Sequence, residues 1–202
     1  MKHILISFIF LLFSSFNACA QDVHVFAGHQ QSIDWMESIG WWGEDLRAEQ
    51  MQVPRPLLIA ISPAWRDAAA QMAVATKKEF FYRCLLPLVT HANWLVRQRR
   101  AWLMERKAGL ESGRALEAQH LENMRLFATT LRVRSSDEAE RISESTEWLS
   151  IIDELLYRLD EIPAGLALGQ AAYESGWGTS RFTDEGNALF GQWTYGGEGM
   201  AP

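Results

Sequence analysis

The sequence predicts a mainly α-helical protein, and two patterns support this prediction. Between residues 76 and 159, apolar side chains recur at alternating three- and four-residue steps, the spacing that places them on one face of an α-helix. From Ala164 to Ser175 the chain is rich in alanine and glycine, and such small side chains let a helix approach its neighbours closely. Because 48% of the 202 residues are hydrophobic, the chain is also long and apolar enough to bury a sizeable core.

The first twenty residues have the features of a secretory signal peptide. Lys2 provides a positive start, Ile4–Phe13 is an apolar run, and Ala18-Cys19-Ala20 fits a cleavage site of small residues. The apolar run is too short for stable membrane insertion. We therefore expect residues 1–20 to be removed on export, which predicts a periplasmic protein. An alternative is that Cys19 becomes the lipid-modified first residue of an anchored protein.

Residues 21–75 are expected to form an extended or irregular N-terminal segment. Within it, Ser32–Trp42 has the pattern of a short amphipathic helix. Three prolines then favour an extended path between residues 54 and 63, because each proline restricts the residue before it. The apolar run at residues 57–61 fits either a strand or a buried extended segment, and both interpretations stay open.

Residues 76–145 are predicted to form a helical region. Its first helix begins near Thr76, and its apolar stripe consists of Phe81, Leu85, Leu88, Ala92, Leu95 and Trp102. Pro87 lies inside this helix and should kink it. After a turn marked by glycines at positions 109 and 113, a second helix from Leu116 to Leu131 is expected to return against the first as a helical hairpin.

Two further helices are predicted after a polar break at residues 135–144. One runs from Thr146 to Leu159. Pro163 then suits the first turn of the next helix, where its missing N–H costs nothing. This last helix, Ala164–Ser175, is expected to lie in the centre of its domain, with Tyr173 packed in the core.

The composition excludes several classes of function. The formal net charge is −6 and no basic stripe occurs, which argues against binding to nucleic acid. His24 and His29 lack a third ligand at a suitable spacing, so neither a metal nor a cofactor is implied. Cys84 lies among apolar residues and is expected to be a buried, inert thiol. The nine tryptophans suit cores and sugar-stacking clefts alike.

Glu174 is the residue best placed for catalysis. It lies at the C-terminal end of the small-residue helix, where unpaired carbonyl groups disfavour a carboxylate, and the indole of Trp177 follows three residues later. Both features are expected to raise the pKa of Glu174, and a carboxyl group that holds its proton can protonate the leaving oxygen of a glycosidic bond. Gly176 and Gly178 allow the sharp turn that would expose this group to a cleft.

A long run around Glu174 resembles a known family. Residues 162–182 read IPAGLALGQAAYESGWGTSRF, and residues 186–193 read GNALFGQW. Together they resemble the glucosaminidase domain of bacterial Bax-type proteins, and they are similar to the hydrolase domain of the flagellar rod-cap protein and to glycoside hydrolase family 73. Upstream, Val53–Arg55 and short segments between residues 77 and 93 resemble the helical region that precedes this domain in Bax-type proteins.

The resemblance implies a lysozyme-like, mainly α fold that cuts the glycan strands of peptidoglycan at the β-1,4 bond after N-acetylglucosamine. Residues 76–145 would be the helical region of Bax-type proteins. Residues 146–202 would be the N-terminal part of the glucosaminidase domain, with only the start of its small β-lobe. Glu174 would be the general acid, and the implied substrate-binding side chains are Trp177, Asn187, Phe190 and Trp193.

The four substrate-binding candidates also have structural interpretations. For Trp177, Phe190 and Trp193, core packing fits the sequence as well as contact with a sugar does. Asn187 is expected to fix the loop below the site through hydrogen bonds from its side chain to the backbone.

A hydrolytic glycosidase usually needs a second carboxylate, as a base or a nucleophile. The nearby candidates are Asp184, Glu185 and Glu198, each of which also suits a solvated loop. In the family this group comes from the small β-lobe and later segments. Residues 192–195 resemble a strand that enters a turn without a returning strand. We therefore expect the chain to be a fragment, truncated at its C-terminus, with an incomplete cleft.

Two other functions fit the same residues. A lytic transglycosylase also uses one helix-end glutamate, and the sugar's own hydroxyl group replaces the second carboxylate. Its products end in anhydro-muramic acid, whereas those of the hydrolase end in reducing N-acetylglucosamine. The third interpretation is a non-catalytic module that binds the cell wall or a partner protein, with the hairpin at residues 76–133 as its docking surface. Alternatively, the hairpin supports a catalytic core by packing against it.

Overall fold

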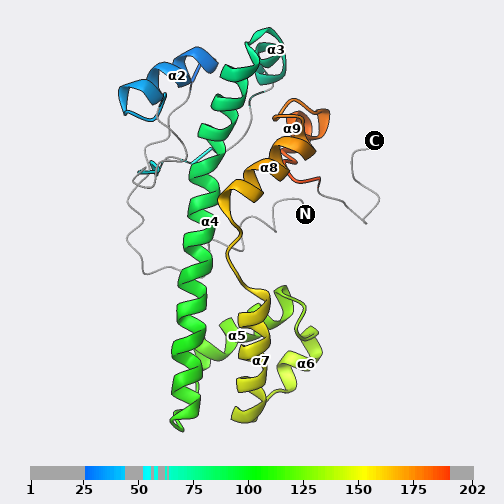
Figure 1. Ribbon diagram of the computed structural model, residues 1–202. Helices are drawn as coiled ribbons and strands as arrows, with labels where there is room; N and C mark the ends of the chain where they lie inside the picture. The colour runs from blue at the N-terminus through cyan, green and yellow to red at the C-terminus, as the bar shows by residue number, and fades with distance from the viewer. Residues whose placement is uncertain (1–25, 44–51, 56, 59–61, 63, 192–202) are drawn as a thin grey trace. The chain divides into compact units, whose positions relative to one another are not determined.

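The computed structural model describes residues 26–43, 52–55, 57–58, 62 and 64–191 (Figure 1). These residues form helices and connecting turns without any β-strand, which confirms the predicted mainly α fold. The helices are α2 (His29–Ser38), α3 (Ala64–Gln71), α4 (Val74–Glu111), α5 (Ala118–Thr130), α6 (Ser136–Arg141), α7 (Ser145–Arg158), α8 (Ala164–Ser175) and α9 (Arg181–Gly186). Several predicted features lie outside the described residues: the signal peptide, Cys19, Trp193, the strand at residues 192–195, and Glu198.

The long helices lie close to their predicted positions, whereas three short ones were not predicted. α3, α6 and α9 fall in segments that were expected to be irregular, because helices of six to eight residues are too short to show an apolar stripe. α6 nevertheless has a sequence signal. Its capping box joins the backbone amide of Ser135 to Glu138 Oε2 at 2.7 Å and the amide of Glu138 to Ser135 Oγ at 3.3 Å. These bonds to Ser135 lower the pKa of Glu138.

The chain divides into two compact units. One contains residues 95–161, and the other contains the described residues between 26 and 94 together with 162–191. α4 is continuous and contributes to both units. α7 lies in the first of these units and α8 in the second.

In the unit of residues 95–161, the second half of α4 packs with α5, α6 and α7 around an apolar core (Figure 1). The core side chains are Leu103, Leu110, Met124, Ala128, Val133, Ala139, Ile142, Trp148, Ile151, Ile152 and Leu155. The Trp102 ring of α4 lies edge-on to His120 and Phe127 of α5, with ring centroids 5.8 Å apart in each case. The two helices of the predicted hairpin therefore do pack together, and α7 adds a third helix to them.

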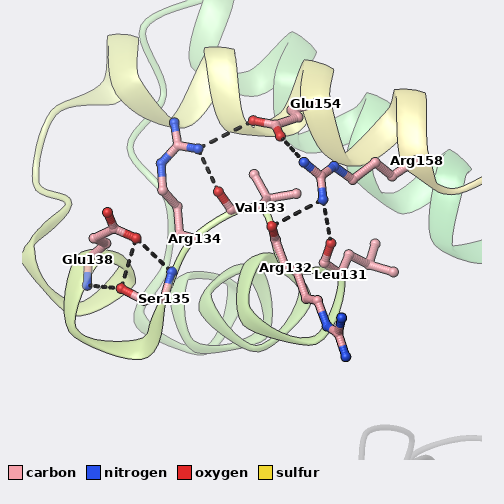
Figure 2. Close-up of polar contacts among 8 residues, drawn as sticks. All are labelled: Leu131, Arg132, Val133, Arg134, Ser135, Glu138, Glu154 and Arg158. Atoms are coloured by element: carbon pink, nitrogen blue, oxygen red, sulfur yellow. Dashed lines mark hydrogen bonds and ion pairs between the residues drawn. The ribbon is translucent and has the colours of Figure 1, made fainter. Parts of the chain in front are cut away.

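The turn between α5 and α6 is fastened to α7 by two arginines (Figure 2). Arg158 of α7 donates hydrogen bonds to the carbonyl oxygens of Leu131 and Arg132, at 3.0 and 3.1 Å. Glu154 accepts from Arg158 at 2.6 Å and from Arg134 at 3.3 Å. Carbonyl groups at the C-terminal end of a helix have no hydrogen-bond donor inside the helix. The Arg158 guanidinium donates to two such carbonyl groups just after α5.

The proline inside α4 is accommodated by a tryptophan from another part of the chain. Pro87 has no N–H, so the carbonyl group of Arg83, four residues earlier, loses its partner in the helix. The indole Nε1 of Trp41 donates to that carbonyl oxygen at 3.0 Å, and its ring lies 5.1 Å from the buried Arg83 guanidinium carbon. α4 therefore continues through Pro87 without a break.

Trp41→Phe is expected to lower the free energy of unfolding by about 1–3 kcal/mol, because a buried carbonyl group is left without a donor. In a Pro87→Ala background the new amide of residue 87 can donate to Arg83, so the cost of Trp41→Phe should fall by about 1 kcal/mol. Denaturant unfolding of the four proteins measures this coupling. If the effects of the two substitutions on the free energy of unfolding were strictly additive, Trp41 would not be replacing the missing N–H of Pro87 as the donor to Arg83.

The second unit has its own apolar core, in which α8 packs against the first half of α4. Its buried residues are Met36, Trp41, Phe81, Leu85, Leu86, Leu168, Ala171 and Ala172. α8 is buried on this face only, whereas Leu166 and Tyr173 are exposed among the described residues, Tyr173 to 86%. The prediction that Tyr173 packs in the core is wrong, because Leu168, Ala172 and Ser175 define a face that turns Tyr173 outward.

Cys84, predicted to be a buried, inert thiol, is partly buried in the structure. It lies in α4 beside this second core, and burial raises the pKa of its thiol to about 12. At neutral pH almost no thiolate is present to act as a nucleophile or metal ligand.

Candidate functional site

Glu174 lies in the last turn of α8, and its side chain is exposed. α8 ends there because Gly176 adopts a left-handed conformation with φ of +56°. The amide of Trp177 then donates to the carbonyl oxygen of Ala172 at 2.9 Å, the six-to-one hydrogen bond of a Schellman motif. The predicted sharp turn is present, and it displays the carboxyl group of Glu174 at the helix end.

The turn after Glu174 is strained and internally braced. Gly176, Trp177 and Gly178 all have positive φ, and a left-handed tryptophan costs about 1–2 kcal/mol. The hydroxyl group of Ser175 is fully buried, donates to the carbonyl oxygen of Ala171 at 2.5 Å and accepts from the amide of Gly178 at 2.9 Å. Ser175 therefore holds the turn in shape, a role that its position beside Glu174 in the sequence did not reveal.

Trp177 fastens the same turn to two other helices. Its ring packs edge-on against Phe81 and Tyr82 of α4, with centroids 5.6 and 5.3 Å away, and Lys78 Nζ lies 5.0 Å from the ring centroid. Its carbonyl oxygen accepts a hydrogen bond of 3.0 Å from the indole of Trp65 in α3. These contacts give the half-buried Trp177 a structural role in positioning Glu174.

The loop at residues 187–191 is fixed by the end of α9. Asn187 ends the helix in a left-handed conformation with φ of +51°, which asparagine tolerates better than most residues. The side-chain contact to this loop in the described structure comes from the buried Thr183, whose hydroxyl group donates to the carbonyl oxygen of Ala188 at 3.1 Å. Asn187 contributes its backbone conformation instead of the expected side-chain hydrogen bond.

Gly191 brings this loop to Glu174. A Cβ atom at position 191 would lie 3.1 Å from Glu174 Oε2 and 3.7 Å from Cδ, and the φ of Gly191 is +59°. The left-handed backbone favours glycine, and a larger residue here would also press on the Glu174 carboxyl group. The structure thus places two sequence motifs side by side, the turn at residues 174–178 and the loop at 187–191. Gly191 is a site residue that the sequence did not single out.

The structure describes three further candidate residues of the site. Phe190 is 42% exposed, and Glu185 of α9 is exposed. Asp184 has one carboxylate oxygen, Oδ1, that is buried without a hydrogen-bond partner in the described structure. Within the described ranges, histidine, cysteine and acidic side chains nowhere gather in threes around a possible metal position. None of the described helices is both long and apolar enough to cross a membrane.

Comparison with known proteins shows which family the chain resembles. Residues 152–200 match the glucosaminidase family model, described as mannosyl-glycoprotein endo-β-N-acetylglucosaminidase. Over 115 residues the chain is 30% identical to Protein bax of Escherichia coli (strain K12). The predicted resemblance to Bax-type glucosaminidase-domain proteins is confirmed.

The glucosaminidase-type segment, residues 152–200, contains both motifs of the candidate site. The stretch similar to Protein bax covers 57% of this chain but 38% of that relative, so the chain spans less than two-fifths of its length. No solved structure matches the chain.

Proposed function

We propose that the protein is an exported, periplasmic peptidoglycan hydrolase that cleaves the β-1,4 bond after N-acetylglucosamine, with Glu174 as its general acid. The main observation that supports this proposal is the position of Glu174. Its carboxyl group is exposed at the end of α8, and the loop that ends at Gly191 reaches it within the glucosaminidase-type segment. A glycan strand of the cell wall is the substrate that fits this assignment.

Glu174 acts by giving its proton to the glycosidic oxygen as the bond to the leaving sugar breaks. Such transfer requires that the carboxyl group be held in position before the substrate arrives. Ser175 and Trp177 provide this support, because they bond the turn to α8 itself and to α3 and α4. Positioning residues and the acid are therefore adjacent in the sequence but have separate roles.

A hydrolase also needs a carboxylate that activates water or attacks the sugar. Asp184 and Glu185 of α9 are the candidates within the described residues, and Glu198 lies outside them. Of the four substrate-binding candidates, Trp177 and Asn187 would act by shaping the site, and Phe190 and Trp193 would contact the sugar, with Trp193 outside the described residues. For Phe190, the partly exposed ring supports this assignment, because an exposed aromatic face suits stacking on a sugar.

The chemistry of the product ends tests the proposed reaction. Peptidoglycan is digested with the protein, and half of each digest is reduced with borohydride before mass spectrometry. Reducible N-acetylglucosamine ends are expected. Anhydro-muramic acid ends would instead identify a lytic transglycosylase, and saccharide binding without any new ends would identify a wall-binding module.

Gly191→Ala is expected to lower turnover about tenfold or more, because the added Cβ displaces the Glu174 carboxyl group or the loop beside it. Gly113→Ala is the matched control: its φ is also positive, at +81°, but a Cβ there meets nothing within 4 Å. Both variants should lose about 1 kcal/mol of stability from backbone strain. Equal turnover in the two variants would show that the close approach of residue 191 to Glu174 does not matter for activity.

A further inference from the structure

The peptide group between Trp177 and Gly178 is held at both of its polar ends. Its carbonyl oxygen accepts a hydrogen bond of 3.0 Å from the indole Nε1 of Trp65, and its N–H donates to Ser175 Oγ at 2.9 Å. Rotation of this group would break both hydrogen bonds, because a peptide group is planar and its two polar ends turn together. The two partners therefore fix one orientation of the backbone shortly after Glu174.

This backbone orientation needs support from the surrounding structure. Residues 176–178 all have positive φ, and a tryptophan keeps such a conformation only where its surroundings enforce it. Ser175 contributes from within the turn, since its hydroxyl group also donates to the carbonyl oxygen of Ala171 in α8. Trp65 contributes from another helix, α3, and thus ties the turn to a distant part of the chain.

Trp65 is itself held in place by its neighbours. It is buried, and its ring stacks on Phe80 of α4, with ring centroids 4.7 Å apart and an angle of 26° between the ring planes. Its indole N–H therefore has a fixed direction, toward the carbonyl oxygen of Trp177. Trp65 lies outside the glucosaminidase-type segment, residues 152–200, so the sequence motifs around Glu174 give no indication of it.

We propose that Trp65 is a positioning residue of the candidate active site, which raises the turnover rate without contacting the substrate. By holding the peptide group between Trp177 and Gly178, it keeps the last turn of α8, and with it the Glu174 carboxyl group, in the orientation that proton transfer requires. The catalytic unit then extends beyond the glucosaminidase-type segment to α3. This inference rests on the proposed function, because turnover is its main consequence.

Trp65→Phe removes the N–H donor but keeps an aromatic ring beside Phe80. On soluble glycan strands from peptidoglycan, kcat is expected to fall about tenfold or more while KM stays within about twofold, because a displaced acid slows the reaction without weakening substrate binding. Trp41→Phe is the matched control: Trp41 is also buried and also donates to a backbone carbonyl at 3.0 Å, but that carbonyl belongs to Arg83 in α4. It should lose similar stability and keep its kcat. Equal kcat values in the two variants, or a change in KM alone, would overturn the proposal.

Hydrogen exchange, followed by NMR on the ¹⁵N-labelled full chain, tests the same contact without any enzymatic activity. In the unsubstituted protein, the indole proton of Trp65 is expected to exchange about tenfold or more slowly than that of Trp94, which is 44% exposed. The amide of Gly178 should exchange about tenfold faster in Trp65→Phe than in Trp41→Phe. Equal rates in either comparison would overturn the proposal. If the expected rates were found in an unsubstituted protein that cleaves no glycan, the proposed function would be wrong, whereas the hydrogen bond from Trp65 would stand.

Discussion

Glu174→Gln is expected to lower the rate of peptidoglycan solubilisation by about 10²–10⁴-fold, the usual contribution of a general acid. Glutamine has nearly the shape of glutamate but has no acidic proton to transfer to the leaving oxygen. Because the Glu174 side chain is exposed, the substitution should leave the thermal unfolding temperature unchanged. The decrease in turbidity of a cell-wall suspension gives the rate.

Glu37→Gln is the control for this experiment. Glu37 is an exposed glutamate of α2 in the same compact unit, outside the glucosaminidase-type segment. Its replacement makes the same change in net charge, so full activity is expected. If Glu174→Gln solubilised the cell wall as fast as Glu37→Gln does, Glu174 would not be the acid.

Leu155→Ala is expected to give the largest loss of stability, about 2–5 kcal/mol in the free energy of unfolding. Leu155 of α7 is 0% exposed and lies in the core of the unit of residues 95–161, so its removal leaves a cavity among well-packed side chains. Denaturant unfolding monitored by helix content measures the loss. Met104→Ala, at a side chain of similar size that is 49% exposed in the same unit, should cost less than about 1 kcal/mol. Similar losses for both would contradict the assigned core.

The long helices could be predicted because their apolar faces repeat over several turns. The predicted helix at residues 164–175 coincides with α8, and the predicted helix from Thr146 to Leu159 is within one residue of α7 at each end. Which face of α8 is buried could not be predicted in the same way. Small residues occur all round this helix, so periodicity does not distinguish the face of Leu168 from that of Tyr173.

The candidate site shows a similar division between local and long-range information. The glycines after Glu174 predicted the turn correctly, because positive φ is a local requirement. The approach of Gly191 to Glu174, the bond from Trp65 to Trp177 and the bond from Trp41 to Arg83 join residues far apart in the chain. No spacing in a single sequence encodes such contacts.

The central claim is that Glu174 is the acid of a glycosidase that acts on peptidoglycan. Its most direct test is mass spectrometry of the soluble fragments that purified peptidoglycan releases with the unsubstituted protein and with Glu174→Gln, side by side. Fragments that end in reducing N-acetylglucosamine are predicted with the unsubstituted protein alone. The same fragments in equal amounts from both proteins, or none from the correctly folded unsubstituted protein, would contradict the claim.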